Sequence, residues 1–385
     1  MQPTMPAVTA PSDHARGRTT TTRARRTAPP VLVRQVRNGV EESAHRGDIV
    51  EVDAAGRIVR ALGDPEHVVN LRSAGKPFAL LALLEAGGIK EFELEPAELA
   101  IMAGSHSGED LHVRTLQAMF RRTGVSQAGL RLGNEGMPLD ALTAARLARD
   151  GERPGDIRHM CSGQHATFLL LARIRGWSTD EYWLNDHPTQ VAVAEVVARA
   201  FGTTPAKLRT GYDGCGIPTF AFPLHDVARA YAFLADPESV PAKDPRAALA
   251  PPLAIVRDAM LGNPEMVAGS RERLDTSVMK ALPGRIVAKG GAEGLRAYAI
   301  LPGPRARKGS ASASGLALKV EDGGSAVRGP EVASIEALAQ AGVLDGQALR
   351  VLGRYHQPIT TDVHGRPAAE AVASFELAPV GELLG

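Results

Sequence analysis

The pattern of apolar and polar positions predicts strands toward both ends of the chain. Near the N-terminus, short segments rich in β-branched residues are separated by the turn-prone pairs Asn38-Gly39 and Ala55-Gly56, which is typical of a strand meander. The predicted strands here are Val31–Arg37, Gly47–Asp53 and Arg57–Leu62. Much later in the chain, the same type of pattern predicts strands at Arg285–Ala288, Leu295–Leu301 and Gly315–Lys319.

Helical periodicity dominates the middle of the chain. From Lys76 to Ala86 the apolar residues follow helical spacing, and Gly87-Gly88 ends the run. Residues from about 96 to 201 are also predicted to be mostly helical. The clearest helices are Ala141–Arg149, Cys161–Arg175 and Pro188–Ala200, and a later one, Pro330–Ala341, is expected to lie over the C-terminal strands. The proline-containing stretches are predicted to be loops, at Pro251-Pro252 and Pro302–Pro304.

Strands at both ends around a helical middle predict an α+β fold in which distant segments share one sheet. We therefore expect one domain over residues 31–385, with a helical subdomain at roughly 96–210. Residues 1–30 are rich in Thr, Pro, Ala and Arg. Such a segment buries too little apolar surface to offset the entropy lost on ordering, so we expect a disordered tail.

Composition narrows the choice of partners and compartment. The 385 residues include 44 basic and 43 acidic ones, and only 4% are aromatic, which argues against nucleic acid or an anionic membrane as a partner. No apolar run reaches the roughly 18 residues of a membrane span, and the first thirty residues carry no secretory signal. With only two cysteines, we expect a protein of a reducing compartment, the cytoplasm. As partners we expect a small-molecule substrate and a second copy of the chain, in a homodimer.

The first segment with chemical potential is Ser73-Ala74-Gly75-Lys76, at the start of a predicted helix. Residues three positions apart lie on one face of a helix, so the two side chains are neighbours. A serine hydroxyl is a poor nucleophile until a base removes its proton, and a lysine whose pKa is depressed by burial can be that base. The pattern alone equally fits a helix-capping Ser73 beside a solvated Lys76.

Two further segments have compatible chemistry. Ser105-His106-Ser107-Gly108-Glu109-Asp110 follows a small apolar stretch and can form a hydroxyl-bearing wall, or simply cap a helix that begins near Asp110. Lys289-Gly290-Gly291 follows a predicted strand, where glycines allow another molecule to approach the backbone. This segment is similar to the K-[ST]-G motif of serine β-lactamases and penicillin-binding proteins. An ordinary glycine turn with a surface lysine is the alternative.

Cys161 and Cys215 are the two cysteines, and His165 and Asp213 lie near them in the sequence. All four are chemically suitable zinc ligands. Because no C-x-x-C pair is present, two buried free cysteines in the core explain the pattern as well.

Together, eight segments in chain order resemble the L-asparaginase II family of the rhizobial type. They are Val40–Gly47, Arg72–Pro77, Gly104–Glu109, Cys161–Ala166, Asp213–Pro218, Pro264–Gly269, Ala288–Gly294 and Gly315–Gly323. The resemblance implies a serine β-lactamase/glutaminase-like fold, with a mostly antiparallel sheet flanked by helices. It also implies hydrolysis of L-asparagine to L-aspartate and ammonia.

Carried onto this sequence, the family's catalytic residues are two Ser–Lys tandems, Ser73 with Lys76 and Ser105 with Lys289. We expect Ser73 to attack the amide carbon. Substrate binding is assigned to Arg72 for the α-carboxylate and Asp213 for the α-ammonium group, with further contacts from His165 and Gly290.

The chain departs from the family pattern at the zinc site, which uses two cysteines and a lysine in a C-S-G-K-H segment. Cys161 and Cys215 match, but Gln164 stands in place of the lysine. A glutamine amide is a weak ligand, so we predict weak zinc binding or none, and no required cofactor. Gly133–Pro138 also lacks a Cys-Gly-x-His pattern common in the family. There are two alternatives to asparagine hydrolysis. One is hydrolysis of glutamine, a β-lactam or an ester, and the other is amino-acid binding without catalysis.

Overall fold

One antiparallel sheet brings together segments from the two ends of the chain. The computed structural model describes residues 27–132, 136–303, 312–323 and 329–380. Its strands are β1 (Val31–Arg37), β2 (Val40–Asp53), β3 (Ile58–Leu62), β7 (Ile286–Gly290), β8 (Leu295–Ile300), β9 (Ser314–Val320), β10 (Ile359–Thr361) and β11 (Pro367–Ala373). The order is β10-β11-β1-β2-β9-β8-β7, and β3 pairs with β2. The pairing of β2 with β9 confirms that distant segments share the sheet.

The strands β7, β8 and β9 form the buried part of this sheet, since nearly every residue in them is inaccessible. Helix α9 (Leu224–Ala235) packs on β2, β8 and β9, and α13 (Gly329–Gln340) packs on β1, β9 and β11. A Cβ atom on Gly315 of β9 would lie 1.9 Å from the carbonyl oxygen of Ala228, so only glycine lets α9 approach so closely. Strand β7, which carries Lys289, therefore belongs to the tightly packed part of the sheet.

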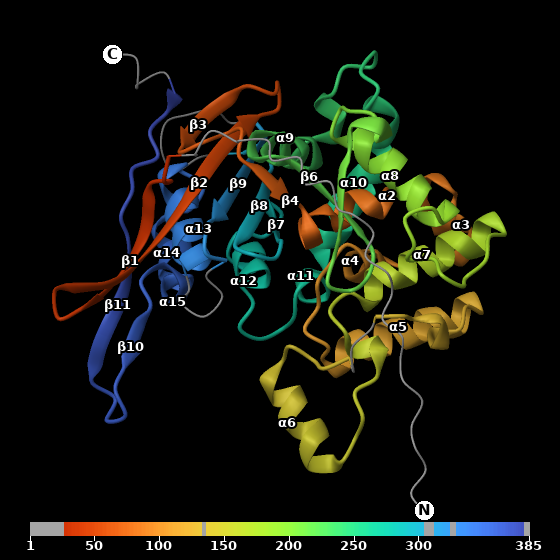
Figure 1. Cartoon of the computed structure of the whole chain (residues 1–385), viewed down its shortest axis with the longest axis horizontal. Coiled ribbons are helices and arrows are strands. Elements are labelled where there is room, and N and C mark those ends of the chain that lie inside the picture. Colours follow the sequence, from red (N-terminus) through yellow and green to blue (C-terminus); the bar gives the residue numbers. More distant parts are fainter. Residues whose placement is uncertain (1–26, 133–135, 304–311, 324–328, 381–385) are drawn as a thin grey trace, which may run out of the picture.

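Most other helices gather beside the sheet, as Figure 1 shows. They are α1 (Lys76–Ala79), α2 (Leu81–Glu85), α3 (Gly88–Phe92), α4 (Pro96–Met102), α5 (Asp110–Thr123), α6 (Ala141–Asp150), α7 (Ser162–Arg175), α8 (Pro188–Ala200), α10 (Ala250–Gly262), α11 (Pro264–Val267) and α12 (Leu274–Ala281). Helix α4 packs against α5, α7, α10 and α11, while α10 and α12 reach β7 and so join the two parts. The remaining elements are α14 (Gly346–Val351), α15 (Gly353–His356) and a small sheet of β4 (Val68–Asn70), β6 (Pro218–Pro223) and β5 (Arg209–Tyr212).

The predicted α+β class is confirmed, and α8 has the predicted bounds. The prediction of a loop at Pro251-Pro252 is wrong, because both prolines lie in the first turn of α10, where the missing N–H has no helical partner to lose. Residues 1–26 of the predicted tail, 133–135 and Pro304 lie outside the described residues. Within the described ranges, every helix is too short or too polar to cross a membrane.

Candidate active site

A cavity of about 400 Å³ lies where the sheet meets the helical part. Its wall combines segments that are distant in the sequence, from before α1, after α4, before α7, between β5 and β6, and from the end of β7. Seven of the residues predicted from the sequence line it, namely Arg72, Ser73, Ser105, Cys161, Asp213, Cys215 and Gly290. Fold and sequence motifs therefore converge on one place.

Ser73 lies in a tight turn that is held from both sides. The preceding residue, Arg72, has a φ of 47°, a left-handed conformation that is costly for a residue with a Cβ atom. The Arg72 N–H donates to the Thr219 hydroxyl at 3.0 Å, and the Lys76 N–H donates to the Ser73 carbonyl. These contacts hold the Ser73 side chain at the cavity wall, where its hydroxyl makes no hydrogen bond with any described residue.

Lys76 lies one turn further on and is almost completely buried. Its ammonium group donates to the Ser105 hydroxyl at 3.0 Å and to the Gly104 carbonyl at 2.9 Å. It also lies 3.4 Å from the Met160 carbonyl oxygen and 3.3 Å from the Cys161 sulfur. Lys76 is therefore a hydrogen-bond partner of Ser105, whereas the expected pairing with the Ser73 hydroxyl is not formed.

Lys289, on β7, approaches Ser105 from the other side. Its Nζ atom lies 3.0 Å from the Ser105 hydroxyl and 2.6 Å from the Gly290 carbonyl oxygen. Burial lowers the pKa of Lys289 to about 7, although Asp275 opposes the shift, and the charge of Lys76 lowers it further. About half of this amine is consequently neutral near physiological pH, and Ser105 forms a bridge between two amines.

The backbone around Ser105 explains how a serine comes to lie between two lysines. The Ser105 N–H donates to the Val267 carbonyl at 2.7 Å, and a Cβ atom on Gly104 would lie only 2.6 Å from that same oxygen. Helix α5 does begin at Asp110, but its cap is a reciprocal pair of Glu109 and His112. The Ser105 hydroxyl is therefore not used as a cap.

Arg72 and Asp213 form an ion pair on the cavity wall, with 2.6 Å between Arg72 Nε and Asp213 Oδ1. The Gly214 N–H also donates to Asp213 at 2.6 Å. The N–H of Gly290 donates to Asp275 at 2.8 Å, and the Gly290 carbonyl oxygen accepts the hydrogen bond from Lys289. A positive and a negative side chain thus lie next to each other in the cavity.

Three of the predicted site residues do not line the cavity, namely Lys76, Lys289 and His165. The two lysines contact Ser105, which does line it. The His165 ring is fully buried, with Nδ1 2.7 Å from the Tyr182 hydroxyl. Burial lowers the pKa of His165 to about 3, so the ring is neutral at any physiological pH. A contact between His165 and a substrate in the cavity remains a prediction that this geometry does not favour.

The two cysteines are buried, free and hydrogen-bonded to each other. The pKa of Cys161 lies well below its usual range, despite burial, because the thiol of Cys215 donates a hydrogen bond to it and because Lys76 and His159 favour its charged form. The same hydrogen bond raises the pKa of Cys215. Cys161 is therefore the more acidic of the two thiols, and its sulfur lies 3.3 Å from the Lys76 amine.

The residues present do not fit a zinc ion. Protein zinc sites use three or four ligands, and nowhere in the described ranges do three His, Cys, Asp or Glu side chains come close enough to hold a metal. Gln164 is buried in the first turn of α7, where the family has its lysine. We therefore assign no step to a metal ion.

The sequence analysis missed several charged residues of the cavity, chiefly Arg273, Asp275 and Arg296. Asp275 is buried and accepts hydrogen bonds from the Gly290 N–H and from Arg296, at 3.1 Å. Burial opposes its ionisation, but the charges of Arg296 and Lys289 hold the pKa of Asp275 below its ordinary value. Arg273 and Asp275 closely follow the segment Pro264–Gly269, which the sequence analysis had identified as family-like. Their proximity to this segment could have marked them as candidate site residues.

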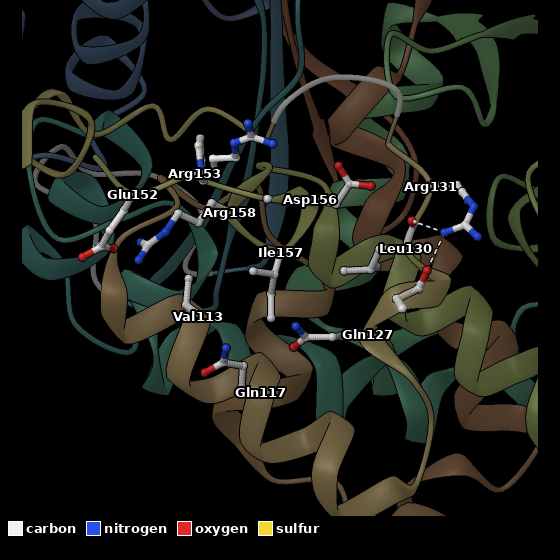
Figure 2. Close-up of a pocket in the computed structure, with 13 residues that line it drawn as sticks. Val113, Gln117, Gln127, Leu130, Arg131, Glu152, Arg153, Asp156, Ile157 and Arg158 are labelled. Carbon is white, nitrogen blue, oxygen red and sulfur yellow. Dashed lines mark hydrogen bonds between the residues drawn. The ribbon is translucent and has the colours of Figure 1, made fainter. Parts of the chain in front are cut away.

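A second hollow, of about 510 Å³, opens next to α5 and the segment before α7 (Figure 2). In this hollow, Arg131 donates to the carbonyl groups of Ala128 and Leu130. Arg158 donates to the Asp110 carboxylate at 2.7 Å. The described residues that line it include no Ser, Thr, Cys, Lys or His, so this larger hollow offers no nucleophile with a base.

Comparison with known proteins gives the context for this arrangement. The family model of L-asparaginase II matches residues 33–373. No curated protein sequence matches the chain. A crystal structure of a Bacillus glutaminase in the presence of 4.3 M NaCl is similar, with 13% identity, coverage of 78% of this chain and 92% of that chain, and a TM-score of 0.38. A probable glutaminase from Bacillus subtilis, complexed with 6-diazo-5-oxo-L-norleucine, is similar at 12% identity, with coverage of 80% of this chain and 81% of that chain, and a TM-score of 0.32. On the match over residues 33–373, the chain belongs to the L-asparaginase II family.

Proposed function

We propose that the protein hydrolyses the side-chain amide of L-asparagine, giving L-aspartate and ammonia. Membership of the L-asparaginase II family supports an amidohydrolase. The observation that carries the proposal is the position of the Ser105 hydroxyl, 3.0 Å from the amines of both Lys76 and Lys289, in a cavity that Ser73 also lines. A serine hydroxyl next to a neutral amine is one arrangement that allows acyl transfer without a metal ion.

The charged wall of the cavity suits an amino acid as substrate. A free amino acid carries a carboxylate and an ammonium group on the same α-carbon, and Arg72 and Asp213 present the two opposite charges side by side. Arg72 contacts Asp213 through Nε, so the terminal N–H groups of Arg72 are left to bind the α-carboxylate of the substrate. The Asp213 carboxylate can then accept the α-ammonium group.

In the proposed reaction, the Ser73 oxygen forms a bond with the amide carbon. The Ser73 proton passes to the Lys76–Ser105–Lys289 chain, in which Lys289 is the amine with a pKa near neutrality. This transfer requires Ser73 to come within hydrogen-bond distance of Lys76 when substrate binds, a contact that the described structure does not form. Collapse of the tetrahedral intermediate breaks the C–N bond, and the same chain returns the proton to the leaving ammonia. Water then cleaves the acyl-enzyme, again through general-base catalysis, to release aspartate and free Ser73.

A panel of amides tests the proposed substrate. Ammonia release is measured with L-asparagine, D-asparagine, L-glutamine and a simple amide that lacks the α-carboxylate, beside a chromogenic β-lactam. We expect L-asparagine to have the highest kcat/KM and the carboxylate-free amide to be a poor substrate. Faster turnover of glutamine or of the β-lactam would contradict the assignment. Thermal stabilisation by L-asparagine without ammonia release would instead indicate a binding protein.

The identity of the nucleophile is tested separately with a diazoketone analogue of asparagine, which alkylates a reactive serine in the site. Peptide mapping is expected to locate the label on Ser73, and Ser73→Ala should prevent labelling. A label on Ser105, retained in Ser73→Ala, would transfer the role of nucleophile to Ser105.

A further inference from the structure

Arg273 contacts the backbone of Ser105, whereas the two lysines contact its hydroxyl. Its Nη2 atom donates to the Ser105 carbonyl at 3.1 Å, and its Nη1 atom donates to the Ser107 hydroxyl at 2.9 Å and to the Ala268 carbonyl at 3.0 Å. The Ser107 hydroxyl in turn donates to the Ala268 carbonyl at 2.9 Å. One guanidinium therefore joins the Ser105 segment to the loop that precedes α12.

We propose that Arg273 is a positioning residue, which holds Ser105 at the point where the amines of Lys76 and Lys289 converge. The Ser105 hydroxyl can contact both amines only if its backbone stays fixed to within a fraction of an ångström. The planar fork of an arginine can hold several acceptors in one geometry, which a lysine cannot do. This role rests on the proposed Ser/Lys chemistry of the same site.

Arg273 also differs from the other arginines of the cavity in having no carboxylate among its hydrogen-bond partners in the described structure. Arg72 is paired with Asp213, and Arg296 is paired with Asp275. The partners that hydrogen-bond Arg273 in the described structure are two carbonyls and one hydroxyl, all neutral. A positive charge without a contacting carboxylate makes a second positive charge nearby less favourable.

Lys289 is the group on which this charge acts. The charged groups that face Lys289 are Asp275 from α12, Lys76 from α1, Cys161 from before α7, and Arg273. Asp275 and Cys161 raise the pKa of Lys289, whereas Lys76 and Arg273 lower it. Removal of the Arg273 charge should therefore raise the proton affinity of Lys289, and activity should require a higher pH.

Three variants separate geometry from charge. Arg273→Gln removes both the fork and the charge, Arg273→Lys keeps the charge, and Arg271→Gln is the matched control. Arg271 lies in the same loop and pairs with Asp140 and Glu109, but it does not contact Ser105. Thermal melting of each variant checks that the fold is retained.

The measurements are kcat/KM for L-asparagine as a function of pH, and the titration of Lys289 by lysine NMR, with the signal assigned through Lys289→Met. We expect Arg273→Gln to lose about a hundredfold in kcat, because a misplacement of about one ångström costs about that much. We also expect the acid limb of its pH profile, where activity falls as Lys289 becomes protonated, to move to higher pH. Arg273→Lys should recover part of kcat and leave the limb in place, and Arg271→Gln should leave the limb unmoved.

Three results would overturn the proposal. They are a kcat within about threefold of the wild type in Arg273→Gln, an equal loss in Arg271→Gln, and an unchanged Lys289 titration in Arg273→Gln. If the wild type released no ammonia from L-asparagine, the proposed function would fail, but the NMR titration would still decide whether Arg273 acts on Lys289.

Discussion

The pH dependence of turnover follows from the environment of Lys289. The side chain is 1% exposed, and burial lowers its pKa from the ordinary 10.5 to about 7. One pKa unit corresponds to about 1.4 kcal/mol, so the fold disfavours the charged amine by roughly 5 kcal/mol. At about pH 7 roughly half of the lysine is neutral, compared with about 0.03% for an ordinary lysine. The neutral, proton-accepting form thus becomes more than a thousandfold more abundant, which is enough to affect catalysis.

The assay is ammonia release under kcat/KM conditions across the pH range, in buffers of constant ionic strength. We expect an acid limb with a midpoint near pH 7, because activity requires the neutral amine. Roughly a tenth of the plateau should remain about one pH unit below the midpoint. A plateau that extends down to about pH 5 would refute the argument, since almost all of Lys289 would then be charged. A midpoint near 10 would refute it as well, because the amine would then be an ordinary lysine.

Further predictions concern the same group and its neighbours. Because the folded pKa of Lys289 lies below the unfolded one, its unfavourable effect on stability is greatest below about pH 7 and disappears as the pH rises toward 10.5. Lys289→Met should therefore abolish turnover but raise the melting temperature, more at acid than at alkaline pH, and an equal or lower melting temperature would contradict this. Asp275→Asn removes a charge that favours protonated Lys289, so the acid limb should move to lower pH, and a shift to higher pH would reverse the assigned sign. After chelator dialysis, elemental analysis should find no zinc, whereas one tightly held zinc per chain would show that Gln164 does not prevent binding.

The sequence predicted the architecture well where periodicity was strong. Pro188–Ala200 gives a helix with the predicted bounds, and the buried strands β7, β8 and β9 lie within a residue or two of their predicted positions. Prolines were the main source of error, because Pro251 and Pro252 fit the first turn of a helix as well as a loop. The edge strand β10 and its neighbour β11 went unpredicted, since few of their residues are buried and no clear alternation marks them.

For the site, the sequence could name the residues but not their pairing. Ser73 and Lys76 are neighbours in the chain, yet the Lys76 amine hydrogen-bonds to Ser105, which is 29 residues away. Such a contact depends on how α1 and the end of α4 pack together, and no local pattern encodes it. The same reasoning applies to His165, whose position on α7 directs its ring toward Tyr182 rather than into the cavity.

Comparison of the wild type with Ser73→Ala in one ammonia-release assay on L-asparagine tests the central claim most directly. We expect the wild type to release ammonia without added metal, and the variant to lose about 10⁴-fold or more in kcat while it keeps the fold, as is typical of a covalent nucleophile. Comparable turnover in Ser73→Ala would contradict the assigned mechanism. The absence of ammonia from the wild type would contradict the proposed function itself.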